Sequence, residues 1–290
     1  MTPLMPLRRP QILIFSYHKS GTVLFARIME KLGARLGLSV RTQRGMVYDI
    51  DPAADIVRLP HSLLGFTLAR PFRAVRVVRD PRDIWVSGYL YHRHTNEGWC
   101  VNSNFDPTPP IGYPRVDFSM LHRPERWKRG WLARLNGRSY QQNLGERDQA
   151  AGLAFELEGY TGCTLAAMRA WRPLPGTLDV RLEDIAADFD AVLARVFQHL
   201  GFTGEECACA LEIAAAEDIN RMDDTALAAN PHIHSRTLSK WRETLSAEQL
   251  RQFERQYGDL VTGLGYDLSS PSLKGYGSRS PVVRLGGRPR

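Results

Sequence analysis

The chain has 290 residues, of which 43% are hydrophobic and 24% charged, and this ordinary globular composition excludes a chain that is disordered throughout. Its length suits one large domain or two small ones, and is enough to bury a core without disulfide bridges. The formal net charge of +7 favours a polyanionic partner, but the whole excess lies in residues 1–10 and 269–290, and residues 11–268 are formally neutral. We therefore expect no broad basic surface for nucleic acid.

Neither the cysteines nor the apolar runs indicate an exported or membrane protein. The four cysteines form no Cys-x-x-Cys pair, and Cys207 and Cys209 lack the second pair that a zinc site needs. The apolar run 12–15 is shorter than a signal sequence and far shorter than a bilayer span. These patterns predict a cytoplasmic protein without a transmembrane segment or a metal site.

Short apolar runs and amphipathic segments alternate along the chain. Strands are predicted over 11–15, 55–59, 74–78 and 177–182. Helices are predicted over 21–36, 80–94, 124–135, 147–158, 162–172, 189–200, 204–216 and from a capping box at Ser246 and Gln249 onward.

This alternation predicts one α/β domain over 11–268, with a central, mostly parallel sheet and helices on both faces. In such folds ligands bind beyond the carboxyl ends of the strands. We interpret residues 1–10 as a basic extension. The segment 269–290, dominated by Ser, Gly, Pro and Arg, is interpreted as a disordered basic tail.

The first strand-to-helix turn, residues 16–22, reads Ser-Tyr-His-Lys-Ser-Gly-Thr. Free N–H groups at the helix start, close approach at Gly21 and the charge of Lys19 together make an anion cradle. Ser20 and Thr22 add hydroxyl donors. Because the lysine precedes the glycine, this is not the Gly-x-x-x-x-Gly-Lys-Ser/Thr loop of nucleoside triphosphatases. The alternative is an ordinary Ser/Thr-rich helix cap.

The second such turn begins at Arg79, directly after the predicted strand 74–78. Asp80, Pro81 and Asp83 are typical residues of a capped helix start. An arginine that ends an apolar strand needs an anionic partner, and its fork of N–H groups suits a phosphate. Ser87, two turns into the helix, can reach the same phosphate if the helix packs beside the ligand.

Together the two turns resemble those of sulfotransferases that use 3′-phosphoadenosine 5′-phosphosulfate (PAPS). The first turn resembles the family's 5′-phosphosulfate loop Tyr-Pro-Lys-Ser-Gly-Thr, with His18 in the place of Pro. The second resembles its 3′-phosphate motif, an arginine at a strand end followed by a serine on the next helix. The resemblance implies a P-loop NTPase-like fold and PAPS bound by Lys19, Ser20, Gly21, Thr22, Arg79 and Ser87.

Two further segments resemble the family more weakly. Residues 180–185 are similar to its segment ending in Tyr-Glu-Asp-Leu, with Leu182 where an aromatic residue often contacts adenine. Residues 234–242 are similar to a shortened form of its late loop, anchored by Trp241, and this likeness implies that Arg236 binds the 3′-phosphate. The alternatives are a plain helix start in the first segment and a surface arginine in the second.

His61 follows the predicted strand 55–59, in a place comparable to that of the family's catalytic histidine. Imidazole has a pKa suited to accepting a proton from an alcohol near neutral pH. His92 and His94 are rivals for this role. The resemblance implies a PAPS-dependent sulfotransferase that needs no metal, with His61 as the base and Lys19 stabilising the leaving phosphate during transfer to a hydroxyl or amine.

The acceptor, a small molecule or a glycan, is expected to bind in residues 95–145, an insertion rich in Asn, Gly and Pro in which aromatic residues alternate with arginine. Alternatively, Trp127 and Trp131, four residues apart on a predicted helix, are core residues. Two other functions stay open. A P-loop-type kinase needs a Walker A loop and a Walker B aspartate, which the sequence lacks. An inactive nucleotide-binding relative, or a nucleic-acid binder, has only the basic ends in its favour.

Overall fold

The structure of the protein, a computed structural model, describes residues 9–65, 68, 71–103, 124–223, 225 and 237–269. Its main sheet has five parallel strands in the order β2-β4-β1-β6-β7. These strands are β1 (Gln11–Ser16), β2 (Val40–Thr42), β4 (Ile56–Pro60), β6 (Phe72–Val78) and β7 (Thr177–Arg181). A second, two-stranded parallel sheet pairs β3 (Gly45–Val47) with β5 (Ser62–Leu64). The predicted α/β domain with a central parallel sheet is confirmed.

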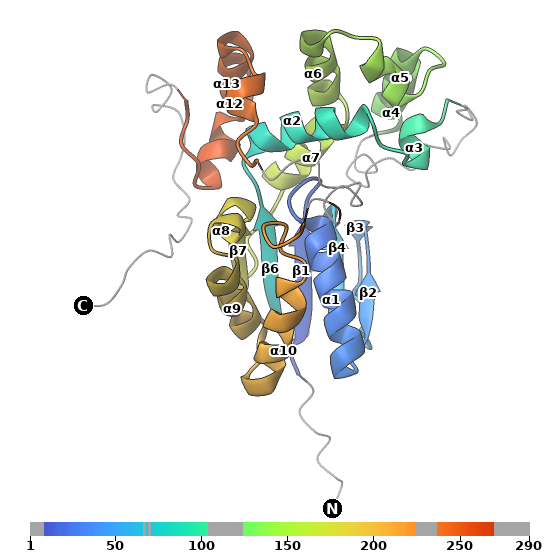
Figure 1. The fold of residues 1–290 in the computed structure, drawn as a ribbon. Coiled ribbons are helices and arrows are strands. Elements are labelled where there is room, and N and C mark those ends of the chain that lie inside the picture. The colour runs from blue at the N-terminus through green and yellow to red at the C-terminus, as the bar shows by residue number, and fades with distance from the viewer. Residues whose placement is uncertain are drawn as a thin grey trace, which may run out of the picture.

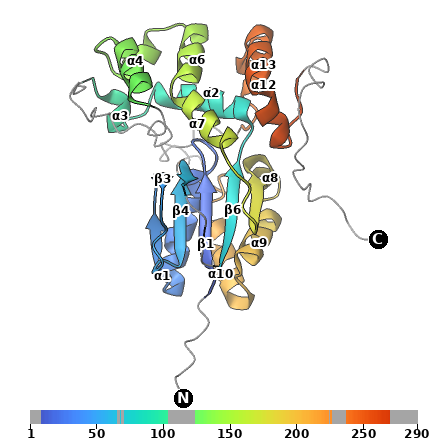
Figure 2. The same ribbon diagram turned by 180° about the vertical axis from the view of Figure 1, so that it is seen from behind.

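Helices cover one face of the main sheet (Figures 1 and 2). They are α1 (Thr22–Leu36), α8 (Leu182–Ala187), α9 (Phe189–Leu200) and α10 (Gly204–Ala215). Their apolar stripes, with Ile28 and Phe197 among the buried residues, share a core with Ile12 and Val75 of the sheet. This stripe-on-sheet packing is what the helical periodicity in the sequence predicts.

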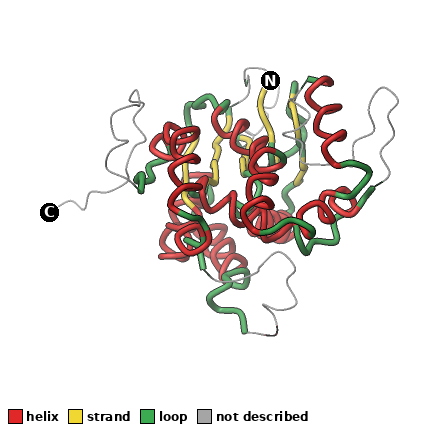
Figure 3. The backbone as a smooth tube through the Cα atoms, turned by 90° about the horizontal axis from the view of Figure 1, so that it is seen from above, coloured by secondary structure: helices red, strands yellow, loops and turns green. Residues whose placement is uncertain are grey.

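The other face of the sheet carries a smaller core, in which Leu13 and Phe15 pack with side chains outside the helices, such as Trp171 and Leu174. The ring of Trp171 lies edge-on against that of Phe15 at 4.8 Å. The expectation of helices on both faces therefore holds for one face only within the described ranges, because loops and the small sheet cover the second. Figure 3 shows most helices on one side of the strands.

A layer of further helices lies beyond the carboxyl ends of the strands (Figure 1). It consists of α2 (Pro81–His92), α3 (Gly98–Val101), α4 (Glu125–Leu135), α5 (Tyr140–Gly145), α6 (Gln149–Glu158), α7 (Tyr160–Arg169), α12 (Trp241–Thr244) and α13 (Ala247–Gly263). The layer has its own core around Trp85, Tyr89 and Phe253. Because the strands are parallel, the turns after them gather at one edge, beneath α2.

Capping residues and glycines in the sequence predicted most helix ends correctly. Asp80 caps α2 by accepting a hydrogen bond from the Arg82 N–H, with Pro81 in the first turn. The capping box of Ser246 and Gln249 starts α13, and Gly201, with φ 89°, closes α9. The helix predicted over 80–94 is α2, which ends at His92. The helix predicted over 162–172 is α7, which spans residues 160–169. In the described part of the chain no helix is long and apolar enough to cross a bilayer.

Several expectations fall on residues outside the described ranges. They concern nearly all of the basic extension 1–10 and of the tail 269–290, the middle of the insertion 95–145, and Arg236.

Candidate functional site

The two predicted anion-binding turns follow neighbouring strands of the sheet. β1 pairs with β4 on one side and with β6 on the other. The chain adds β2 and β4 on one side of β1 and then β6 and β7 on its other side, so the strand order reverses at β1. Such a switch point is where ligands bind in open parallel sheets. The turn after β1 and the turn after β6 therefore meet where the fold favours a ligand, and a hydrogen bond of 3.0 Å from Arg79 Nη1 to the Lys19 carbonyl joins them.

Hydroxyl groups hold the β1–α1 turn closed from within. The fully buried Ser20 Oγ accepts a bond of 2.7 Å from the Tyr17 N–H and lies within 3.1 Å of the carbonyl oxygens of Tyr17 and Val77. Thr22 Oγ1 lies 2.9 Å from both the Tyr17 carbonyl and Ser16 Oγ. The Ser20 hydroxyl, expected to be offered to a ligand, is thus engaged by the turn itself.

The N-terminus of α1 has no side-chain cap. Its N-cap residue, Gly21, has φ 93°, and a Cβ there would lie 3.3 Å from Leu182 Cδ1. Glycine is required because its backbone is left-handed and Leu182 closes in on it. The first N–H groups of a helix have no intrahelical partners, and they attract anions. This end of α1 therefore has the uncapped N–H groups that the predicted cradle requires, and anion binding there stays a prediction.

Lys19 also has a left-handed backbone, with φ 58°. Its Nζ lies 4.1 Å from the centre of the Tyr91 ring, a cation–π contact. Burial, followed by the charges of Arg79 and Lys240, lowers the pKa of Lys19 to about 7, against a smaller opposing effect of Glu97. Lys19 is therefore a cation that an anionic ligand would stabilise.

Arg79 is buried and reaches its expected anionic partner within the protein. Its Nη2 donates a bond of 3.0 Å to Asp83 Oδ2, and Asp83 Oδ1 accepts a bond of 3.2 Å from the Trp241 N–H. Asp83, predicted as a helix-start residue, thus also serves as the counter-ion of Arg79. Burial raises the pKa of Asp83, and Arg79 opposes that rise. Arg79 Nε is buried without a hydrogen-bond partner in the described part of the chain.

Ser87 lies one turn after Asp83 and one turn before Tyr91 on α2. Residues four apart share a helix face, so Ser87 belongs to the face that carries the Arg79 and Lys19 contacts. Its side chain is only 3% exposed, and within the described ranges its Oγ has no hydrogen-bond partner. Buried polar groups are normally satisfied, so this hydroxyl is available to a ligand group that reaches this face of α2.

A third cation, Lys240, was not among the predicted site residues. It directly precedes Trp241, whose N–H binds Asp83, and it is half-buried. Burial and then Arg79 lower its pKa, and Asp83 opposes them. The match of Trp241 to a family loop was the only signal in the sequence that could have directed attention to it.

His61 lies at the carboxyl end of β4, with φ 55°, and its N–H donates a bond of 2.8 Å to the Ser16 carbonyl. Left-handed backbone is uncommon for residues other than glycine and gathers at functional sites. Its ring centre lies 5.9 Å from that of His18 in the β1–α1 turn. The structure thus brings His61 beside the loop that carries Lys19.

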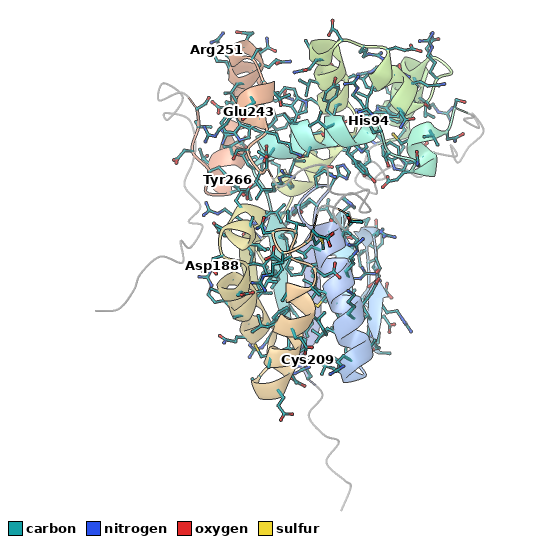
Figure 4. The ribbon with its side chains drawn as sticks, viewed as in Figure 1. His94, Asp188, Cys209, Glu243, Arg251 and Tyr266 are labelled. Carbon is teal, nitrogen blue, oxygen red and sulfur yellow. The ribbon has the colours of Figure 1, made fainter. Side chains whose placement is uncertain are left out.

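The two rival histidines differ from His61 in their surroundings. His92 is fully buried: its Nδ1 lies 2.9 Å from Glu156 Oε2, and its ring stacks on that of His18 at 4.8 Å. Glu156 thus engages one ring nitrogen of His92 inside the protein. His94 is exposed in the upper helical layer, just beyond α2 (Figure 4). Of the three histidines, the half-buried His61 is the one that directly follows a strand of the main sheet, and its role as the base stays a prediction.

The buried carboxylate of Glu156 contacts His92 and joins it to two neighbouring hydroxyl groups. It accepts bonds of 2.8 Å from the Tyr140 hydroxyl and 2.7 Å from Thr161 Oγ1, besides its contact with His92. Gly88 leaves room for it, since a Cβ there would lie 2.9 Å from Glu156 Oε1. Sequence reasoning missed Glu156, because its partners come from three other segments.

Two weaker predictions have mixed outcomes. Leu182 starts α8, with Glu183 and Asp184 in the first turn, which fits the plain helix-start alternative, and Glu183 Oε1 also accepts the Asp80 N–H at 3.0 Å. Leu182 nevertheless lies beside the cradle, since a Cβ at Gly21 would lie 3.3 Å from Leu182 Cδ1. Arg236 lies outside the described residues, so its predicted role stays a prediction.

A groove of about 540 Å³ lies on α4, within the region expected to hold the acceptor. Trp131 is buried and stacks on Tyr140, whereas Trp127 is half-buried, so the core alternative holds fully only for Trp131. The groove is lined by Pro124, Arg126, Trp127, Gly130, Trp131 and Arg134. The acceptor site itself stays a prediction.

In the described part of the chain no three His, Cys, Asp or Glu side chains gather as a metal ion would require. No protein-family model matches the sequence, and no curated protein does. Among solved structures, that of mouse sulfotransferase SULT7A1 complexed with PAP is similar, at 14% sequence identity and a TM-score of 0.43. The similarity covers 89% of this chain and 87% of that one. Because this likeness is remote, the case for a function rests on the residues of this chain.

Proposed function

We propose that this protein is a sulfotransferase that moves a sulfuryl group from PAPS to a hydroxyl or amine of a small-molecule or glycan acceptor. One observation carries the proposal. The uncapped start of α1 and the Asp83–Ser87 face of α2 meet around Lys19 and Arg79, at the switch point of a parallel sheet. Two anion-binding elements at one place suit a ligand with phosphate groups at both ends of a nucleoside.

The polar groups that lack partners fit this ligand. The N–H groups at the start of α1, with Lys19, suit the 5′-phosphosulfate. The buried Nε of Arg79 and Oγ of Ser87 lack partners in the described ranges, and a 3′-phosphate oxygen would satisfy both. Ser20 contributes by holding the turn closed through its hydroxyl.

The residues divide the chemistry between a base and a group of cations. PAPS, when bound, supplies the sulfuryl group and leaves as 3′-phosphoadenosine 5′-phosphate. His61 takes the proton from the acceptor hydroxyl while the acceptor oxygen bonds to sulfur and the bond from sulfur to the 5′-phosphate oxygen breaks. Lys19 and the α1 N–H groups stabilise the negative charge that grows on that phosphate oxygen.

The test is a calorimetric titration of the full chain with 3′-phosphoadenosine 5′-phosphate, compared with ADP plus Mg²⁺. We expect the bisphosphate to bind and ADP to bind at least about tenfold more weakly, because the α2 face would then have no phosphate to hold. Absence of bisphosphate binding, or tighter binding of ADP with Mg²⁺, would overturn the proposal, and the second result would favour a kinase. Binding without any sulfuryl transfer would favour an inactive relative.

A further inference from the structure

Lys240 is a half-buried lysine whose ammonium makes no hydrogen bond or ion pair in the described part of the chain. The other lysines there have partners: Lys31 pairs with Glu217, Lys128 with Glu125, and Lys19 lies over the Tyr91 ring. Withdrawing an ammonium from water without a partner costs free energy. Lys240 therefore stands out among the cations of the chain.

The backbone fixes Lys240 beside the start of α2. The next residue, Trp241, donates its N–H to Asp83 Oδ1 at 3.2 Å, and the guanidinium of Arg82 lies over the Trp241 ring at 4.0 Å. Asp83 in turn binds Arg79 at 3.0 Å. The backbone of Lys240 is thus held beside the acid that pairs with Arg79, and this acid lies one helical turn before Ser87.

The charges around Lys240 do not balance. Arg79 and Lys19 interact with it repulsively, and Lys240 also contributes to the lowered pKa of Lys19. Asp83 is engaged by Arg79, and Glu97 accepts bonds from Tyr91 and Trp99. The three cations Lys19, Arg79 and Lys240 outnumber the two acids, which already have partners. The site is therefore positive and partly buried. Such a local conflict in a folded chain is typical of a functional position.

We propose that Lys240 binds the same phosphate as Arg79 and Ser87, as a third cation of the site. This inference rests on the proposed function and deepens it, because it gives the site a preference for a doubly charged terminal phosphate. Lysine acts on phosphate as a point charge, whereas arginine adds a directional fork, so the two side chains complement each other.

The test compares two ligands and three variants. The ligands are 3′-phosphoadenosine 5′-phosphate and adenosine 5′-phosphate, which lacks the 3′-phosphate. The variants are Lys240→Met, Lys240→Arg and the control Arg242→Met. Arg242 is an exposed neighbour whose guanidinium lies over the Trp241 ring, so the control removes the same charge. Dissociation constants are measured by calorimetry at about 0.15 M salt, where surface charges are screened within about 8 Å.

We expect Lys240→Met to weaken binding of the bisphosphate by about tenfold or more, the size of one charge-assisted hydrogen bond. Binding of adenosine 5′-phosphate should change less than about twofold, Lys240→Arg should recover most of the loss, and Arg242→Met should change neither ligand. The melting temperature of Lys240→Met should equal or exceed that of the wild type, since a repulsion is removed.

The outcomes separate this inference from the proposed function. If the wild-type chain does not bind the bisphosphate, the proposed function fails and this inference fails with it. If the wild type binds but Lys240→Met behaves like Arg242→Met, only the role of Lys240 is overturned. An equal loss for both ligands would also overturn it, because Lys240 would then act on the site's general field and not on the 3′-phosphate.

Discussion

Ser20 and Ser87 are two buried serines of one site with opposite hydrogen-bonding states. The Ser20 hydroxyl is bonded within its turn, whereas the Ser87 hydroxyl has no partner in the described ranges. Ser87→Ala should therefore leave the melting temperature unchanged and weaken binding of 3′-phosphoadenosine 5′-phosphate about tenfold. Ser20→Ala should lower stability by about 1–3 kcal/mol, because it leaves the Tyr17 N–H unpaired. Thermal melts and calorimetry check both, and a destabilised Ser87→Ala with unchanged affinity would contradict the assignment.

The pKa of Lys19 links ligand binding to proton uptake. Its folded pKa of about 7 lies below its ordinary value of 10.5. Between these values the unfolded chain holds the proton and the folded chain does not, so this group makes the unfolding free energy rise with pH across that window. Below pH 7 its full destabilising effect is present.

A bound anion should raise the pKa of Lys19 again, so binding at pH 8 should take up a proton. Calorimetry of 3′-phosphoadenosine 5′-phosphate in two buffers of different ionisation enthalpy measures the number of protons. We expect an uptake approaching one proton for the wild type, which disappears in Lys19→Met. An uptake that persists in Lys19→Met would assign the proton to another group.

His61 is the residue on which turnover should depend most steeply. A general base contributes about 10²–10⁴ in rate, so His61→Ala should reduce transfer by that factor and keep nucleotide affinity within about twofold. The control His94→Ala removes an exposed histidine beyond α2 and should change neither. Turnover that survives in His61→Ala would move the role to another histidine.

At the scale of elements, α2, α6 and α7 are joined through one buried carboxylate. Glu156 of α6 accepts bonds from Thr161 of α7 and from Tyr140, and contacts His92 of α2. Glu156→Gln places an amide against these donors and should cost about 1–3 kcal/mol of unfolding free energy in urea titrations. Glu158→Gln, on the exposed end of α6, breaks only a surface pair with Arg134 and should cost less than about 1 kcal/mol. Equal losses in the two variants would show that the buried contacts contribute nothing special.

The elements that the sequence predicts are those with a long enough pattern. β6 is a buried run, and α2 begins with a capping aspartate and a proline, so both are visible locally. β2, β3 and β5 have three residues each, which is too few to show an alternation, and they were missed. The uneven covering of the two sheet faces also depends on contacts between distant segments, which no local pattern carries.

The residues of the candidate site also divide into those that a local sequence pattern indicates and those that depend on distant contacts. Lys19 and Arg79 lie in turns that follow strands, and Ser87 lies on the helix after the second turn. The strand-to-helix pattern and the family resemblance therefore pointed to all three. Lys240 and Glu156 were missed because the residues that they interact with, the like charge of Arg79 for the first and His92 for the second, lie far away in the sequence. The engaged hydroxyl of Ser20 was equally invisible, since a residue's type does not say which way its side chain turns.

At the scale of the whole molecule, a buried ion network ties the C-terminal helices to the start of α2. Arg82 donates to Asp80 at 2.7 Å and to Glu254 of α13 at 2.8 Å, and its guanidinium lies over the Trp241 ring. Glu254 also accepts the Ser269 N–H at 2.9 Å. The network holds α12 and α13 against the turn after β6, and thereby Trp241 and Lys240 against Asp83.

Arg82→Met should therefore damage stability and the site together. It leaves Asp80 and Glu254 buried without their cation, which should cost about 3–5 kcal/mol of unfolding free energy. The double variant Arg82→Met with Glu254→Leu removes one of the stranded charges and should recover part of that loss. Under conditions where Arg82→Met is still folded, its affinity for 3′-phosphoadenosine 5′-phosphate should also fall, because Trp241 no longer fixes Lys240. The control Arg251→Met, which breaks an exposed pair with Glu248 on α13, should leave the urea midpoint and the affinity unchanged. A stable Arg82→Met with full affinity would show that the C-terminal helices are held by their apolar core alone.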